Sequence, residues 1–291
     1  MKASADSPIT AASIRVRSSN AFRADLEEHR TLTRAETTFF KENGFIKLKN
    51  VLSRETLEFY ARVISEQVDR LNTQHEPLEK RDTYGKAFLQ VTNIWRSDAV
   101  VRDLVFSKKL ARIAAELMGV SGVRLYHDQA LYKEAGGGIT PWHADQFYWP
   151  IDTSNTVTAW IPLQDTPLEM GPIAFAPRSH RIKVGRDVAI SDESEAQIRK
   201  ALRELKLDVV ELAYQLGEVS FHRGWNWHRA GANTTDQPRR VMTVIYMEED
   251  ARLIKPKHNN HQTDWDAWMP GVKVGKVIDS PLNPVLWTTR P

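Results

Sequence analysis

The sequence predicts a mainly β protein, an antiparallel sandwich or barrel that is preceded by N-terminal helices. Helical spacing of apolar residues dominates the first 120 residues, whereas short strand-like segments separated by turn residues dominate from Gly122 onward. A chain of 291 residues is long enough for a substantial core, and β-barrels of this size are often single domains. We expect a single domain over residues 33–291, after a flexible polar arm over residues 1–32.

Composition limits the classes of function. The chain has 41% hydrophobic and 26% charged residues, which is typical of a soluble globular protein. A net charge of +3 gives weak support for binding to nucleic acid or to a membrane, so neither is expected as a partner. Zero cysteines exclude disulfides, thiolate metal sites and a cysteine nucleophile. Since no apolar run has the length of a signal peptide or a membrane span, we expect a cytoplasmic protein.

Caps mark the helices of the N-terminal part, residues 33–120. Thr33 and Glu36 form a capping-box pattern, and Gly44 ends the helix that follows. Ser53 is the expected N-cap of a longer helix with apolar residues at helical spacing. The predicted elements of this helical support are helices over residues 34–43, 54–71, 97–104 and 108–118, a strand over 45–52 and a loop over 74–84.

Residues 121–250 are expected to form the β core. Val, Ile, Tyr and Trp are frequent in its strand-like segments, and turn residues separate these segments. A surface helix over residues 192–206 is inserted, with Ser191 or Asp192 as its cap. Residues 251–291 are expected to wrap the core as irregular structure. The predicted strands cover residues 123–132, 156–163, 171–175, 209–212, 217–222 and 239–247.

A histidine and an aspartate lie two residues apart in the run Thr-Pro-Trp-His-Ala-Asp-Gln at residues 140–146. In an extended segment, side chains at i and i+2 point to the same face, so His143 and Asp145 would converge. A metal ion is the usual reason for such a pair. The second half of the chain offers a third ligand in His222 or His228.

Two imidazoles and one carboxylate form the facial triad of non-haem Fe(II) oxygenases, which leaves three coordination positions open. Such enzymes commonly fill two of these positions with a keto acid and the third with O₂. A keto acid with a distal carboxylate needs a buried, forked cation, which is a property of arginine rather than of lysine. Arg239 and Arg240 open the last predicted core strand, and Arg239 lies 11 residues after His228.

These segments match a known family in their order along the chain. The sequence resembles the phytanoyl-CoA dioxygenase family of Fe(II)/2-oxoglutarate-dependent oxygenases, in its bacterial form, from about Lys41 to the end. The resemblance implies a double-stranded β-helix core of jelly-roll, cupin-like type, and Fe(II), 2-oxoglutarate and O₂ as cofactor and co-substrates. The matching runs are residues 126–133, 140–146, 157–163, 171–180, 217–233 and 238–239.

The resemblance also implies roles for individual residues. His143, Asp145 and His228 are expected to be the catalytic iron ligands, and Arg239 is expected to clamp the distal carboxylate of 2-oxoglutarate. The family's 11-residue spacing favours His228 over His222. Because adjacent strand residues face opposite sides, Arg239 is favoured over its neighbour as the inward-facing arginine.

Further residues are expected around the cofactor site. Gln90, His127 and Gln129 are candidates for contact with 2-oxoglutarate or substrate. Trp149 and Trp225 flank the two ligand segments and are expected to line the substrate pocket. His258 and His261, in the irregular tail, are expected to be solvated.

Two positions depart from the family pattern. Ala230 stands where the family often has a serine that helps to hold 2-oxoglutarate, and Thr243 shares a strand face with Arg239 and is a candidate replacement. Arg178 replaces the glycine of the family's Pro-Gly-Ser-His turn. A different turn conformation is expected there, because arginine disfavours positive φ.

The expected activity is hydroxylation of a C–H bond in a small-molecule metabolite, with release of succinate and CO₂. The same iron site also serves desaturation, epoxidation and ring rearrangement in this class of enzyme. The alternative from another class is a non-catalytic jelly-roll protein with a structural metal. The family name suggests an acyl-CoA substrate, but the sequence contains no dedicated phosphate-binding motif.

Overall fold

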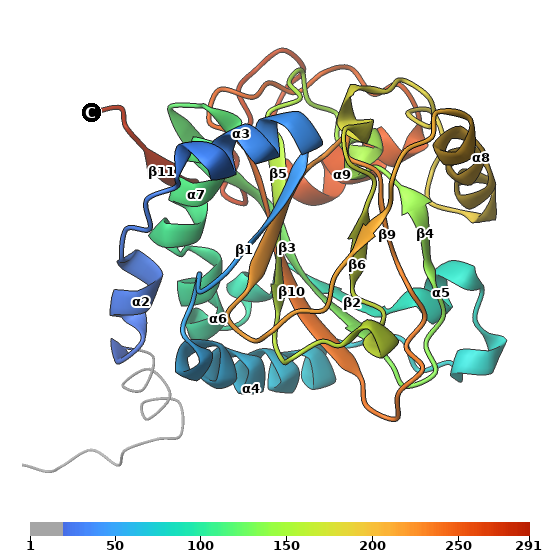
Figure 1. Cartoon of the computed structure of the whole chain (residues 1–291). Helices are drawn as coiled ribbons and strands as arrows, with labels where there is room; N and C mark the ends of the chain where they lie inside the picture. The colour runs from blue at the N-terminus through green and yellow to red at the C-terminus, as the bar shows by residue number, and fades with distance from the viewer. Residues whose placement is uncertain (1–19) are drawn as a thin grey trace, which may run out of the picture.

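Two antiparallel sheets enclose the centre of the protein in the computed structural model, which describes residues 20–291 (Figure 1). The major sheet has the strand order β1-β8-β5-β10-β3-β11, with β2 paired to β3, and the minor sheet has the order β4-β9-β6-β7. A cavity between them is lined by residues of both sheets. This arrangement confirms the predicted jelly-roll core.

The longest strands, β3 with 12 residues and β10 with 10, belong to the major sheet, whereas no strand of the minor sheet exceeds four residues. The major sheet contains β1 (Phe45–Leu48), β2 (Leu89–Thr92), β3 (Gly122–Lys133), β5 (Thr156–Pro162), β8 (Val219–Arg223), β10 (Arg239–Glu248) and β11 (Val285–Thr288). The minor sheet contains β4 (Thr140–His143), β6 (Ile173–Phe175), β7 (Val210–Glu211) and β9 (His228–Ala230).

Helices cover the major sheet on the side away from the minor sheet. The amphipathic helix α7 packs against β3, β5, β10 and β11, and α8 lies beside β4 (Figure 1). The α-helices are α2 (Arg23–Glu27), α3 (Arg34–Asn43), α4 (Arg54–Leu71), α5 (Thr83–Ala87), α6 (Ala99–Val105), α7 (Lys108–Met118), α8 (Asp192–Glu204) and α9 (Asn259–Trp268).

The predicted caps are present. The Thr33 hydroxyl accepts a hydrogen bond from the Glu36 amide, and the Glu36 carboxylate accepts one from the Thr33 amide, which completes the capping box of α3. Gly44 then ends α3 at φ +82°. Gly44 also lies where an added Cβ would meet His180 and Asn226, so no larger residue fits here without displacing them.

The prediction of a flexible arm over residues 1–32 was wrong in part. Residues 1–19 lie outside the described residues, but residues 20–32 contain α2, and Leu26 in this helix is buried. Lys109 of α7 forms a salt bridge of 2.7 Å with Asp25 of α2. The helix is therefore fastened to the body of the protein by an apolar contact and by an ion pair.

The tail was also more regular than predicted. It contains the ten-residue helix α9 and the strand β11, which pairs with β3. His261, expected to be solvated, is buried, and its Nε2 lies 3.0 Å from the carbonyl oxygen of Phe147. The predicted loop over residues 74–84 is interrupted by a turn of 3-10 helix and by the start of α5.

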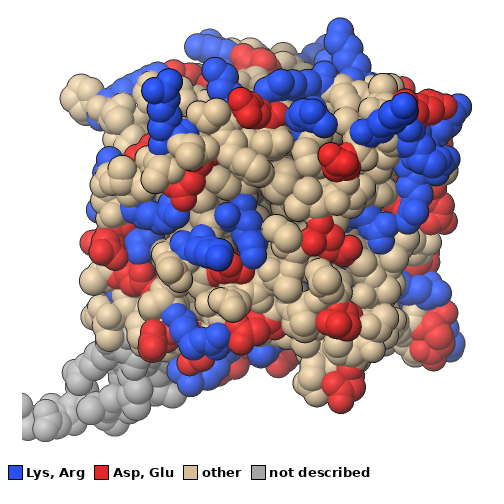
Figure 2. Space-filling view, viewed as in Figure 1, with Lys and Arg blue, Asp and Glu red and all other residues tan. Residues whose placement is uncertain are grey.

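Within residues 20–291, every helix is too short or too polar to cross a lipid bilayer. Figure 2 shows Lys and Arg interspersed with Asp and Glu on the face in view, as the small net charge of +3 leads one to expect.

Candidate metal centre and co-substrate cavity

The three expected metal ligands come from two neighbouring strands of the minor sheet and the turn between the sheets. His143 is the last residue of β4 and pairs with His228, the first residue of β9. Asp145 begins the 3-10 turn η3 (Asp145–Tyr148), which Ala144 separates from β4. One ligand atom from each residue lies within 4.8 Å of the other two, so the group can hold a metal ion.

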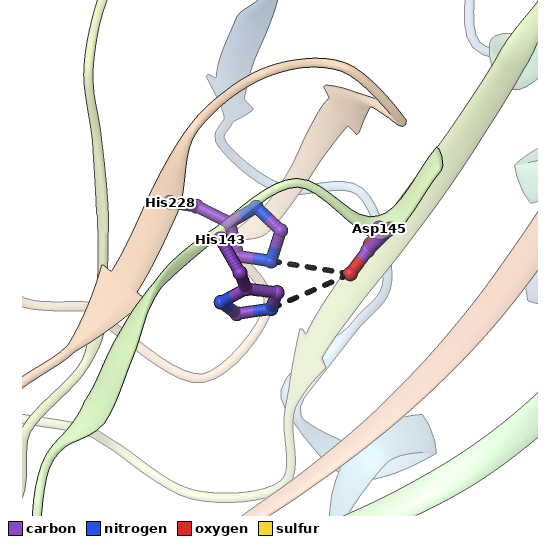
Figure 3. A group of neighbouring side chains, drawn as sticks. All are labelled: His143, Asp145 and His228. Atoms are coloured by element: carbon purple, nitrogen blue, oxygen red, sulfur yellow. Dashed lines mark ion pairs between the residues drawn. The ribbon is translucent and has the colours of Figure 1, made fainter. Parts of the chain in front are cut away.

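The imidazoles of His143 and His228 lie side by side and point at one carboxylate oxygen (Figure 3). Nε2 of His143 lies 3.5 Å, and Nε2 of His228 lies 3.4 Å, from Oδ1 of Asp145. Two nitrogens and one oxygen on a common face are the donor set of the non-haem Fe(II) triad, so the residues present fit iron.

Backbone carbonyls fix which ring nitrogen of each histidine is free. Nδ1 of His143 lies 2.7 Å from the carbonyl oxygen of Pro141, and Nδ1 of His228 lies 3.0 Å from that of Asn226. A carbonyl only accepts, so each Nδ1 carries a proton, and each Nε2 faces the centre, where it would present its lone pair to a bound metal. The ring orientation is thus set before any metal binds.

The second oxygen of Asp145 is held by the major sheet. The Thr158 hydroxyl donates to Oδ2 at 3.1 Å, and Nε2 of His222 lies 3.3 Å from the same atom. Burial by itself raises the pKa of Asp145, but the charge of His228 and hydrogen bonds from the surrounding histidines hold that pKa well below its ordinary value. The carboxylate is therefore in the ionised form that a metal requires.

Arg239 lies at the start of β10, on the wall of the same cavity, and is 1% exposed. Nη1 donates to the carbonyl oxygen of Gly171 at 2.8 Å, while Nε has no hydrogen-bond partner among residues 20–291. An unsatisfied buried guanidinium donor is costly unless a ligand accepts from it. Arg240 instead bonds Gln164 and is not part of the wall.

The cavity has a volume of about 550 Å³ and brings together most of the expected site residues. Besides the triad and Arg239, its wall contains Gln90, His127, Gln129 and Trp149. Gln90 donates to the Gln129 side chain at 2.5 Å, so these two amides form one polar edge. Burial lowers the pKa of His127 to about 4, which keeps this imidazole neutral at physiological pH.

The departures from the family pattern also lie at this wall. Thr243 lines the cavity on the same face of β10 as Arg239, although its hydroxyl donates to the carbonyl oxygen of Gln129 at 3.2 Å. Ala230 lines it as well. Arg178, in contrast, adopts φ +68°, the left-handed conformation that a glycine would take. The expectation of a different turn conformation was wrong.

Trp225 does not line this cavity, and its expected pocket role is not supported. The turn after β8 directs its ring toward Arg186, whose guanidinium carbon lies 4.4 Å from the ring centroid. The two residues line a separate small depression. A position next to a ligand segment in the sequence therefore did not determine where the side chain points.

Several cavity residues were missed by the sequence reasoning. They come from α5, from η3 and above all from α9, which had been expected to be irregular. The spacing of Asn260, Asp264 and Trp268 by four residues was the available signal, since it places them on one helix face. The missed wall residues include Tyr84, Tyr148, Asn260, Asp264 and Trp268.

A jelly roll that directs two imidazoles and a carboxylate into a cavity with a buried arginine defines the Fe(II)- and 2-oxoglutarate-dependent oxygenases as the class of this protein. Comparison with known families agrees. The phytanoyl-CoA dioxygenase (PhyH) family matches residues 40–241, and the chain belongs to this family. It is an oxidoreductase that uses Fe(II) and 2-oxoglutarate.

Individual relatives are distant. The chain is 28% identical over 156 residues to a protein of Stutzerimonas stutzeri described as a probable alpha-ketoglutarate-dependent hypophosphite dioxygenase, a match covering 52% of this chain but only about half, 54%, of that relative. It is 26% identical over 222 residues to a methylphosphonate hydroxylase of Gimesia maris, covering 74% of this chain and 81% of that one.

Among solved structures, the epimerase SnoN in complex with Fe³⁺, alpha-ketoglutarate and nogalamycin RO is similar with a TM-score of 0.70 and 26% identity. The match covers 87% of this chain and 98% of SnoN. Similarity over nearly the whole of a structure that contains iron and the keto acid confirms the predicted fold and cofactors.

Proposed function

We propose that His143, Asp145 and His228 bind Fe(II) and that the enzyme hydroxylates a C–H bond of a small molecule. The observation that carries this proposal is the convergence of two Nε2 atoms and Oδ1 of Asp145 in one cavity with Arg239. A structural metal site would have no use for the buried arginine, since no group among residues 20–291 accepts a hydrogen bond from its Nε.

Each residue has a defined task in this proposal. Arg239 binds the distal carboxylate of 2-oxoglutarate through its free guanidinium edge. Thr158 and His222 hold the outer oxygen of Asp145, so that the inner oxygen faces the metal. The rings of Trp149 and Trp160 form apolar wall that limits access of water to the centre. The bound iron and keto acid supply the O₂-dependent oxidation, with release of succinate and CO₂.

Residues 33–291 act as a single oxygenase domain in this proposal, since the cavity draws residues from α5, both sheets and α9. The lack of cysteine fits a reducing compartment, which supports a cytoplasmic location.

The direct test is succinate formation from 2-oxoglutarate with Fe(II) and O₂, which proceeds slowly even without substrate. Asp145→Ala should abolish both iron binding and succinate release and should leave the melting temperature close to that of the wild type. A protein that binds one iron but shows no charge-transfer band with 2-oxoglutarate and forms no succinate would be a non-catalytic metal-binding jelly roll.

Ring rearrangement or epimerisation is the second candidate, because the structural neighbour SnoN is described as an epimerase. Both reactions begin with oxidation of a C–H bond and diverge afterward. Incorporation of one ¹⁸O atom from ¹⁸O₂ into the product indicates hydroxylation. A product with unchanged or lower oxygen content indicates ring rearrangement or epimerisation.

A further inference from the structure

The cavity is long enough to have two ends, which the pairing of β10 with β3 defines. Arg239 pairs with Lys133 at one end, and Ile245 pairs with His127 six residues further along β10. Six residues of strand span about 20 Å. 2-Oxoglutarate occupies the end at Arg239 in the function proposed above, so the end at His127, here called the distal end, remains for substrate.

Helix α9 forms one wall of the distal end. Asn260, Asp264 and Trp268 follow one another at intervals of four residues, and all three side chains line the cavity. The phenolic hydroxyl of Tyr126 donates to Oδ2 of Asp264 at 2.6 Å, and the Trp268 ring lies 4.8 Å from the His127 ring. These contacts hold the carboxylate in place at the cavity wall.

Among the residues that the structure describes, no arginine or lysine forms an ion pair with Asp264. Within the described part of the chain, the only arginines and lysines that line the cavity are Arg229 and Arg239. Arg239 lies at the other end, and Arg229 is directed outward, with Nη1 3.9 Å from Glu195 of α8. The neutral His127 adds no positive charge. Asp82 is another carboxylate that lines the cavity, but it caps α5 and is exposed to solvent.

The raised pKa of the Asp264 carboxyl also indicates that a cation is missing beside it. Burial raises the pKa of its carboxyl to about 7, although hydrogen bonds from Tyr126 and Trp268 oppose this change. A cation placed beside the carboxylate would restore the ionised form. Aromatic rings at the same end, those of Tyr148, Trp149 and Trp268, supply faces that also attract cations.

We propose that the substrate carries a protonated amine, which binds Asp264 at the distal end against the aromatic rings of Tyr148 and Trp268. This inference deepens the proposed oxygenase function and rests on it for the location of 2-oxoglutarate. Asn260 offers an additional amide for a neighbouring polar group of the substrate. A phosphonate or other anion in the same place would face the Asp264 carboxylate with no arginine or lysine to balance it.

The test uses three probes that share one hydrocarbon part: 2-phenylethylamine, 2-phenylethanol and 2-phenylethylphosphonate. Their dissociation constants are measured by calorimetry on the full chain loaded anaerobically with Fe(II) and 2-oxoglutarate. The amine should bind at least about tenfold more tightly than the alcohol, and the phosphonate should bind most weakly. Equal or tighter binding of the alcohol or phosphonate, or no binding of the amine at millimolar concentration, overturns the proposal.

Two matched variants locate the effect. Asp264→Asn should weaken amine binding at least about tenfold and bring it close to that of the alcohol. Asp266→Asn removes the same charge from an exposed position two residues further along α9, and it should preserve the preference for the amine. An unchanged preference in Asp264→Asn, or an equal loss in both variants, overturns the assignment to Asp264.

A measurement of succinate formation without probe distinguishes a failure of the amine-binding inference from a failure of the oxygenase function. If succinate forms but the amine is not preferred, the amine inference fails and the oxygenase function stands. If the amine is preferred and succinate never forms, the oxygenase function fails and the distal binding site stands.

Discussion

Nε2 of His222 lies 3.3 Å from Oδ2 of Asp145, the carboxylate oxygen that the other two histidines of the centre do not approach. His222 comes from β8 of the major sheet, whereas His143 and His228 come from the minor sheet. The carboxylate is thereby held between the two sheets. The sequence offered His222 as a rival metal ligand, and the structure gives it a role in positioning the aspartate.

His222→Leu should lower the affinity for Fe(II) about 10- to 100-fold, because residues that orient a metal ligand typically contribute that much. The measurement is a calorimetric titration with Fe(II) under anaerobic conditions. Thr158→Val removes the other hydrogen bond to Oδ2 with little change in shape and serves as the comparison. Wild-type affinity in a folded His222→Leu protein would rule out the positioning role.

Arg239→Lys should weaken 2-oxoglutarate binding roughly 100-fold, which corresponds to about 3 kcal/mol. A lysine retains the positive charge but lacks the planar fork that grips a carboxylate with two parallel hydrogen bonds. The charge-transfer absorption of the anaerobic Fe(II) complex, titrated with 2-oxoglutarate, gives the dissociation constant.

Arg240→Lys is the matched control, since the neighbouring side chain bonds Gln164 outside the cavity. It should bind 2-oxoglutarate as the wild type does. If both variants retain wild-type binding, the distal carboxylate of 2-oxoglutarate is held elsewhere.

Local signals in the sequence were sufficient for much of this fold. The capping box of Thr33 and the left-handed stop at Gly44 depend on neighbouring residues alone, so the helix between them was predicted to the residue. The extended run before His143 and the strand parity of Arg239 likewise depend on local periodicity. In the structure, the three candidate metal ligands and Arg239 line the same cavity.

Helix α9 could not be predicted in this way. His261 is its one buried residue, so the segment lacks the apolar stripe that identifies a surface helix. Its inner face is Asn260, Asp264 and Trp268, and it lines a cavity instead of filling a core. The predicted pocket role of Trp225 is not supported for a different reason. A tight turn sets the direction of its side chain, and the periodicity of the sequence carries no information about a turn.

Arg178 holds φ +68° without the freedom of a glycine. The left-handed conformation costs a residue with a side chain about 1 kcal/mol or more, and glycine offsets part of this through its more flexible unfolded chain. Arg178→Gly should therefore raise the free energy of unfolding by up to about 1 kcal/mol in a urea titration. Gly44→Ala is the opposite change at φ +82° with close neighbours, and it should lower the free energy of unfolding. If Arg178→Gly instead destabilises the protein, the arginine side chain contributes more to stability than its left-handed backbone costs.

Lys133 is fully buried beside Arg239, and its Nζ donates to the carbonyl oxygen of Gly138 and to the Thr140 hydroxyl. Burial, together with the charges of Arg239 and Arg229, lowers the pKa of Lys133 to about 6. Between pH 6 and about 10, the unfolded chain therefore binds one proton that the folded chain does not. Acidification through this window favours the unfolded chain.

The free energy of unfolding should thus rise with pH between 6.5 and 9 more steeply in the wild type than in Lys133→Met, by up to about 1.4 kcal/mol per pH unit. Urea titrations of both metal-free proteins at several pH values give the two slopes. Methionine leaves the two acceptors of Lys133 without a donor, but that loss shifts stability equally at every pH and does not alter the slope. Parallel pH profiles for the two proteins would show that Lys133 is protonated in the folded chain and that a neighbouring group balances its charge.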